Sequence, residues 1–319
     1  MAADIKPGWS KPSTILFTSE FPANEKAFTF ALSQATEFGA ELIIFHVCDN
    51  FELNQSDSAP SLGNEYAAVR EAKRRFDALC RRAKDLGIRC KVVIRMGWPA
   101  EQILNFLEER KVDRVIMGAH SPGPVGKLLV GSVAEAVLRS ANAPVCIVGP
   151  HVLEDSYRNL EGRKILCDVS QQQARSAVAS FGSALATSHN ASLILHHVIS
   201  PQERDEVLAY RTIDELEAEL PTLVPSHVQK KLGLRTRVAF GDPIEELLYQ
   251  GRSKQAHIIV LGALGASQFA AVSRAGTVYK ILAYAHCPVM VLSPVLLSEF
   301  GSAESQVQVS KLHYVAGVI

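Results

Sequence analysis

The chain has 319 residues, about twice the usual size of a domain, so two domains of similar length are expected. Its hydrophobic content of 47% and mean hydropathy of +0.09 exclude a disordered chain. Lys+Arg and Asp+Glu each total 33, and this balance gives no electrostatic reason to expect a nucleic acid or an anionic membrane as partner. A pI of about 7.1 gives little protection against self-association and favours an oligomer.

The amino terminus and the cysteines indicate the compartment. No apolar segment follows the basic residues of 1–13, so no secretory signal is predicted, and the longest apolar runs are too short to span a bilayer. The six cysteines are scattered, mostly inside apolar segments and without a CxxC pair. This pattern is typical of small buried side chains in a reducing compartment. We therefore expect a cytoplasmic protein with no disulfide framework and no metal site.

Five blocks of sequence recur in the same order in the two halves of the chain. The matched pairs are 13–17 with 163–167, 40–47 with 191–198, 97–101 with 241–245, 112–118 with 256–262, and 142–148 with 286–292. Five blocks in register across about 150 residues indicate an internal duplication.

The composition of these blocks predicts a fold. Four of the five are short Ile/Leu/Val-rich runs that are apolar throughout, as in parallel strands covered on both faces. Amphipathic helical patterns lie between them, for example over 66–86 and after Pro99. We therefore expect α/β architecture: two tandem, doubly wound, three-layer α/β/α domains with mainly parallel five-stranded sheets.

The expected domain boundaries follow the repeat. Domain 1 covers 12–150 and domain 2 covers 163–295, with a polar connector at 151–162. The C-terminal tail, 296–319, mixes polar residues with an apolar end. It is either loose or docked on a neighbouring subunit, and the sequence does not distinguish these two.

One loop between a strand and a helix suits an anion. Gly131-Ser132 opens a helix after the Gly-containing loop that follows Met117. Helix amino termini offer unpaired N–H groups and a partial positive charge to phosphates. The alternative is a capping box formed by Ser132 and Glu135, which needs no ligand.

Both halves resemble the universal stress protein family, whose nucleotide-binding members carry Gly-x-x-Gly, nine residues, then Gly-Ser/Thr. In the first half Gly118, Gly131 and Ser132 have this spacing, with His120 in the first turn and Ser121 in place of the second glycine. The resemblance covers about residues 13–293. It implies a Rossmann-like, adenine nucleotide alpha hydrolase-like fold in each half.

The resemblance also assigns further residues of an adenine nucleotide site in domain 1. Glu20 stands where the family has Asp at the end of the first strand, within reach of the ribose or adenine. The adenine wall would include Thr18, Ser19, Val47 and Met117, and Val133 would lie beside Ser132 at the phosphates.

The second half departs further from the family pattern. Gly262 and Gly265 keep the first turn, but ten residues separate Gly265 from Gly276-Thr277. Read without gaps, Ser170 stands at the place of the acid, whereas a two-residue deletion would restore Asp168. We expect a degenerate second site.

These features favour a cytoplasmic stress-response module that senses an adenine nucleotide, ATP or AMP, in domain 1 with little or no turnover. Two alternatives stay open: a family member that binds no nucleotide and acts as a protein-interaction scaffold, and a slow ATP hydrolase using His120 or Glu20. No catalytic residue is assigned, because no local signature of a nucleophile or metal site is present. The resemblance further implies that the last strands, 144–148 and 288–292, pair within the chain, and it leaves a homodimer of chains open.

Overall fold

The computed structural model describes residues 5–19, 24–48, 62–119, 131–158, 162–263 and 276–300. The strands of the first half are β1 (Thr14–Thr18), β2 (Glu41–Cys48), β3 (Cys90–Met96), β4 (Arg114–Gly118) and β5 (Val145–Val148). Those of the second half are β6 (Lys164–Asp168), β7 (Ser192–Ile199), β8 (Arg235–Phe240), β9 (Ile258–Gly262) and β10 (Val289–Leu292).

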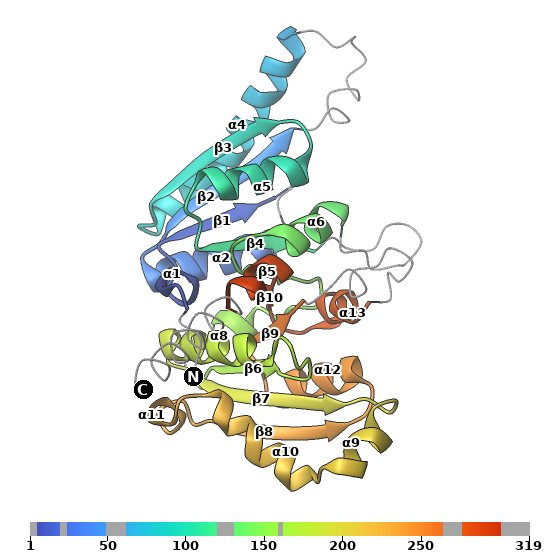
Figure 1. Ribbon diagram of the computed structural model, residues 1–319. Coiled ribbons are helices and arrows are strands. Elements are labelled where there is room, and N and C mark those ends of the chain that lie inside the picture. Colours follow the sequence, from blue (N-terminus) through green and yellow to red (C-terminus); the bar gives the residue numbers. More distant parts are fainter. Residues whose placement is uncertain are drawn as a thin grey trace, which may run out of the picture.

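All ten described strands form one sheet in the order β3-β2-β1-β4-β5-β10-β9-β6-β7-β8 (Figure 1). Within each half every pair of neighbouring strands is parallel. The predicted doubly wound α/β fold, repeated twice, is confirmed. Its two five-stranded sheets are joined edge to edge into a single sheet.

Helices cover both faces of the sheet. The helices of the first half are α1 (Pro7–Ser10), α2 (Glu25–Phe38), α4 (Leu62–Asp85), α5 (Pro99–Glu109) and α6 (Ser132–Ser140). Those that follow are α7 (Asp155–Arg158), α8 (Arg175–Ser188), α9 (Arg204–Tyr210), α10 (Ile213–Glu219), α11 (Ser226–Gln229), α12 (Pro243–Ser253) and α13 (Thr277–Tyr284), with the 3₁₀ turn η1 (Leu220–Leu223) after α10. One core contains buried residues of α2, α4 and α8, and the other those of α5, α6, α12 and α13.

The two cores explain the continuous apolar runs. In β1, Ile15 and Phe17 face the first core and Leu16 faces the second, and all three are fully buried. Because side chains alternate between faces along a strand, a sheet covered on both sides needs apolar residues at successive positions.

The two halves meet where β5 pairs antiparallel with β10. Val145, Cys146 and Ile147 lie opposite Val291, Met290 and Val289, and every one of these side chains is buried. This is the pairing of the last strands that the family resemblance implied. It covers two apolar edges that would otherwise be exposed.

An ionic cluster, formed by the half-buried Glu37 with the buried Arg163 and His189, also links the halves. The Glu37 carboxylate of α2 lies 2.5 Å from the Arg163 guanidinium and 3.0 Å from Nδ1 of His189. Burial acts to raise the pKa of Glu37, but the hydrogen bonds and charges of His189 and Arg163 together outweigh it and hold the pKa below its ordinary value. The sequence patterns did not predict this cluster, because its members are far apart in the chain.

Replacing Glu37 by Ala should lower the free energy of unfolding by about 3 kcal/mol at pH 7, since Arg163 stays buried without its carboxylate. Chemical denaturation measures the change. The control Glu41→Ala removes a carboxylate paired with the exposed Lys91 and should change stability by less than about 0.5 kcal/mol.

The effect of Glu37 should depend on pH, because a carboxyl with a lowered folded-state pKa stabilises the fold above its unfolded pKa. The difference between wild type and Glu37→Ala should therefore shrink as the pH falls below about 4. Equal stabilities at pH 7 would contradict the assignment.

All six cysteines are free thiols, five of them buried and Cys90 half-buried. Burial raises the pKa of Cys146 and of Cys287 to about 12. These thiols therefore stay protonated at neutral pH and pack as small apolar groups. In the part of the chain that the structure describes, no helix has both the length and the apolar character needed to cross a membrane.

The beginning of the predicted tail packs within its own chain. Residues 294–300 are helical, and Leu296 is fully buried. The ring of Phe300 lies 5.6 Å from that of Trp9, and the Lys6 ammonium lies 2.7 Å from the Glu299 carboxylate. Residues 301–319 lie outside the described residues.

Candidate functional site

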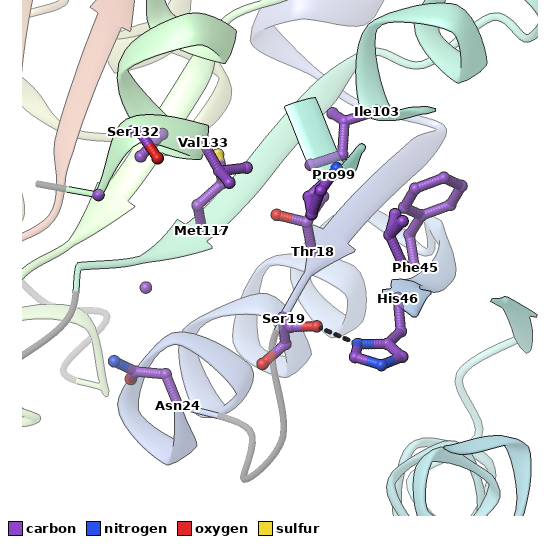
Figure 2. A pocket seen from close by; sticks show the side chains of 14 residues that line it. Thr18, Ser19, Asn24, Phe45, His46, Pro99, Ile103, Met117, Ser132 and Val133 are labelled. Carbon is purple, nitrogen blue, oxygen red and sulfur yellow. Dashed lines mark hydrogen bonds between the residues drawn. The ribbon is translucent and has the colours of Figure 1, made fainter. Parts of the chain in front are cut away.

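A cavity of about 240 Å³ opens at the carboxyl ends of β1, β2 and β4. From β1 the chain passes to β2 on one side and later returns to β4 on the other, which makes this point the topological switch of the first half. Open α/β sheets bind their ligands at such points. The lining residues, most of them labelled in Figure 2, are Thr18, Ser19, Asn24, Phe45, His46, Val47, Pro99, Ile103, Met117, Gly118, Gly131, Ser132, Val133 and Ala134.

The cavity brings together most of the predicted site residues of domain 1. Those in its wall are Thr18, Ser19, Val47, Met117, Gly118, Gly131, Ser132 and Val133. Glu20, His120 and Ser121 lie outside the described residues. Sequence reasoning missed the other wall residues, Asn24, Phe45, His46, Pro99, Ile103 and Ala134.

The amino terminus of α6 faces this cavity without a capping box. Gly131 is the N-cap, with extended backbone (φ −61°, ψ 157°), and Ser132 is already the first helical residue. The alternative in which Ser132 and Glu135 form a capping box is therefore wrong. The Glu135 carboxylate instead lies 2.8 Å from the Arg139 guanidinium. The first N–H groups of α6 have no partner within the helix and bring a partial positive charge to the cavity.

Gly131 leaves room in front of these N–H groups. A Cβ atom added to Gly131 would meet no heavy atom of the described structure within 4 Å. Its φ of −61° is open to any residue, so the backbone itself does not require glycine at this position. The space in front of α6 is thus available to an anion.

Gly118 has a packing role that needs no ligand. A Cβ atom at this position would lie 2.6 Å from the side chain of Asn24. Asn24 caps α2, since its side-chain oxygen accepts a hydrogen bond of 3.0 Å from the N–H of Ala27. Glycine at 118 therefore lets the start of α2 approach the end of β4 closely.

His46 forms part of the wall and is held in one orientation. Its Nδ1 lies 2.9 Å from the backbone carbonyl oxygen of Ser19, as Figure 2 shows. A carbonyl only accepts, so Nδ1 carries the proton. The imidazole also packs against the ring of Phe76, with a centroid distance of 4.7 Å. These contacts give His46 a structural role within the cavity wall.

The described wall has an apolar part and a part suited to an anion. Phe45, Val47, Ile103 and Met117 supply apolar surface, whereas the helix terminus and the hydroxyl of Ser132 supply donors. No Lys, Arg, Asp or Glu is among the described lining residues, so the partial charge of α6 is the main fixed charge in this part of the wall. The geometry suits a ligand with a flat, weakly polar ring and an anionic group.

The strand register corrects one alignment in the second half. Asp168 lies opposite His196, just as Thr18 lies opposite Phe45 in the first half. Asp168 is therefore the counterpart of Thr18, and the two-residue deletion that would place it at the position of Glu20 is wrong. The carboxylate accepts hydrogen bonds from the N–H (3.0 Å) and the hydroxyl (2.5 Å) of Ser170. Burial nevertheless raises the pKa of Asp168.

Arg175 crosses the corresponding crevice of the second half. Its Nε donates to the carbonyl oxygen of Val169 at 3.3 Å, and its other nitrogens lie 3.4 Å from Nδ1 of His197 and from the Glu219 carboxylate. Val169 and His197 are the counterparts of Ser19 and His46. A buried guanidinium thus bridges the strand ends that flank an open cavity in the first half.

The glycines of the second half keep their places around this crevice. A Cβ atom at Gly262 would lie 2.6 Å from that of Ala174, which repeats the approach of Gly118 to Asn24. Gly276 is the N-cap of α13 and Thr277 its first residue, as Gly131 and Ser132 are in α6. Gly265 lies outside the described residues.

His196 allows a test of the difference between the two halves, because it stands in β7 where Phe45 stands in β2. It is fully buried, and neither ring nitrogen has a hydrogen-bond partner among the described residues. Burial lowers its pKa to about 4. Replacing His196 by Phe should raise the free energy of unfolding at pH 7 by about 1–3 kcal/mol, because an unpaired polar group leaves the core.

The pH dependence of this variant follows from the direction of the shift. A histidine whose pKa is lowered by folding binds its proton more readily in the unfolded state, so wild type loses stability as the pH falls from about 6.5 toward 4. His196→Phe should lose less over that window in chemical denaturation. The exposed control His227→Phe should behave like wild type. A His196→Phe protein with the wild-type pH profile would disprove the burial argument.

Comparisons with known proteins agree with the fold and the duplication. A model of the Universal stress protein family matches residues 14–149 and 162–293. A universal stress protein of Methanocaldococcus jannaschii is 29% identical over 150 residues, which cover 42% of this chain and 93% of that protein. It is thus similar to about half of this tandem chain.

Two solved structures are similar over nearly the whole chain. The crystal structure of a universal stress protein from Archaeoglobus fulgidus has a TM-score of 0.71 at 16% identity, covering 89% of this chain and 97% of that chain. The crystal structure of a functionally unknown protein from Pseudomonas aeruginosa has a TM-score of 0.60 at 16% identity, covering 94% and 100%. At this identity the likeness shows a shared fold alone.

Proposed function

Because the chain belongs to the universal stress protein family and contains two family domains in tandem, we propose that its first domain binds one adenine nucleotide, ATP or AMP. The protein is then a nucleotide-sensing module of the stress response with little or no turnover. The observation that carries the proposal is the cavity at the switch point of the first half, with the uncapped amino terminus of α6 in its wall.

The two parts of the wall suggest how the nucleotide lies. The phosphates would accept hydrogen bonds from the first N–H groups of α6 and from the hydroxyl of Ser132, where Gly131 leaves space. The adenine would lie against Val47 and Met117, next to Thr18. Glu20, His120 and Ser121 keep the roles near the sugar and phosphates that the resemblance implies.

One nucleotide per chain is proposed because the second crevice differs. Arg175 bridges Val169 and His197, and Asp168 is engaged by Ser170. These groups occupy the strand ends at which a base and a ribose would lie in the first half. The second domain then serves mainly as a structural partner, in the cytoplasmic location that the sequence predicts.

Calorimetry with ATP and AMP should give a stoichiometry of one per chain, and native mass spectrometry of freshly purified protein should show any nucleotide carried through purification. Gly131→Leu should abolish binding, since its side chain enters the space reserved for the phosphates, yet leave the melting profile unchanged because no described atom lies in its way. Ser140→Leu, at the exposed far end of the same helix, is the matched control and should bind as wild type does. Unchanged affinity in Gly131→Leu would eliminate this site.

Ser132→Ala should weaken ATP and AMP binding by about tenfold, the value of one hydrogen bond to a charged group. Adenosine, which has no phosphate, should bind wild type and Ser132→Ala equally. Equal losses for adenosine and AMP would place Ser132 away from the phosphates. Calorimetry or a competition assay provides both affinities.

The same assays separate the two alternative functions. Sustained phosphate release that falls in His120→Ala or Glu20→Gln would favour a slow ATP hydrolase. No binding in calorimetry together with no bound nucleotide in mass spectrometry would favour a scaffold that acts through protein contacts.

A further inference from the structure

Two crossover segments at equivalent positions in the halves carry opposite charge. Helix α4 lies between β2 and β3, whereas α9 and α10 lie between β7 and β8. Residues 70–91 contain nine Lys or Arg and three Asp or Glu; residues 201–219 contain two and seven. Because β5 and β10 join the halves at the centre of the sheet, these segments lie at opposite ends of the molecule (Figure 1). The neutral net charge therefore conceals a basic end and an acidic end.

The basic end is a stripe along one face of α4. Arg70, Lys73, Arg74, Arg81 and Lys84 recur at helical spacing and, with Asp77 and Cys80, line a shallow groove of about 530 Å³. All five cations are exposed. Only Arg74 has an ion pair among the described residues, with Glu71 at 2.5 Å. The other four are available to an anionic partner.

The acidic end combines free carboxylates with exposed apolar side chains. Asp205 and Asp214 are exposed and form no ion pair within the described structure. Between them in the sequence lie Leu208, Tyr210 and Ile213, which are 39%, 85% and 40% exposed. Large apolar side chains seldom gather on a surface that contacts only water. An aromatic centre with a charged rim is instead typical of a protein interface.

Some carboxylates of this end are already engaged within the chain. Glu215 completes the capping box of α10 with Thr212, and Glu219 pairs with Arg211 and Arg175. These contacts fix the positions of α10 and the strand ends. Glu203 accepts a hydrogen bond from the hydroxyl of Ser200, and Glu217 accepts one from the N–H of Val238. Asp205 and Asp214 are exposed and remain as the described carboxylates for an outside contact.

We propose that the acidic end of one copy docks on the basic end of a second copy, so that chains associate head to tail. The two surfaces are complementary in charge, and Tyr210 supplies an aromatic anchor. Direct pairing of the outer strands is disfavoured, because both carry exposed cations, Lys91 on β3 and Arg235 and Arg237 on β8. The contact is therefore made by helices. Since the two surfaces lie at opposite ends of the molecule, an end-to-end contact leaves one surface of each kind free, and association does not close at a dimer.

Sedimentation velocity of the full chain tests the proposal first. At low salt the average mass should exceed the 34.7 kDa of one chain and rise with concentration beyond a dimer. At about 1 M salt, where charges are screened within about 3 Å, it should return to one chain. A single chain at every salt concentration, or a dimer that does not grow, would overturn the proposal.

Charge reversal tests which surfaces meet. A basic-end variant (Lys73→Glu, Arg81→Glu, Lys84→Glu) and an acidic-end variant (Asp205→Lys, Asp214→Lys) should each be a single chain at low salt. Their equimolar mixture should associate again, because the reversed surfaces complement each other. Tyr210→Ala should weaken association by about tenfold without a change in charge.

A control separates the specific contact from net charge. Lys11→Glu, Arg110→Glu and Lys111→Glu change the same number of exposed cations away from both ends, and this variant should associate as wild type does. Circular dichroism checks that each variant is folded. If both end variants dissociate but their mixture does not associate, α4 does not meet α9 and α10, and the proposal fails.

Discussion

The antiparallel pairing of β5 with β10 is the constraint on which the rest of the structure depends. Each half is a parallel sheet whose last strand is apolar on both faces, and such a strand is unstable at an exposed edge. The joint buries both edges and reverses the strand direction between the halves. The carboxyl ends of the strands therefore lie at opposite margins of one sheet. The two copies of the domain thus present the carboxyl ends of their strands, and their crossover helices, to different sides of the molecule.

Because these strand ends are separated, their side chains can differ between the halves while the backbone packing around them is the same. The close approach of Gly118 to Asn24 is repeated by Gly262 and Ala174, so helix packing is retained in both halves. The polar groups have changed: Thr18 and Phe45 correspond to Asp168 and His196. In the second half Asp168 accepts hydrogen bonds from Ser170, and Arg175 contacts Val169, His197 and Glu219. One half has a cavity at these strand ends, whereas in the described part of the other half Arg175 contacts both strand ends.

The sequence predicted what depends on local pattern. Continuous apolar runs and a five-block repeat predicted the strands, the parallel sheets and the duplication, and the family spacing predicted Gly131 and Ser132 beside one another at the cavity. What failed depends either on the exact first residue of a helix or on contacts between distant segments. The capping box of Ser132 was excluded by a one-residue shift of the helix start, which is below the precision of any pattern. The role of Arg175 has no local signal, because it comes from contacts with Val169, His197 and Glu219, which lie elsewhere in the chain. Asn24 had a local signal, an Asn just before a helix, that was overlooked.

The segment between β5 and β6, residues 149–163, changes the thermodynamics of the central joint. Separate domains that met through β5 and β10 would find each other by diffusion, and their pairing would depend on how much protein a cell contains. A short covalent connection makes the encounter intramolecular, at an effective concentration of the order of millimolar. Gly149 and Lys26 tighten it further, since Gly149 approaches the backbone of Leu282 and the Lys26 ammonium bonds the carbonyls of Pro150 and Val152. The joint therefore forms equally well at any expression level, so the scarcity of the protein does not limit its assembly.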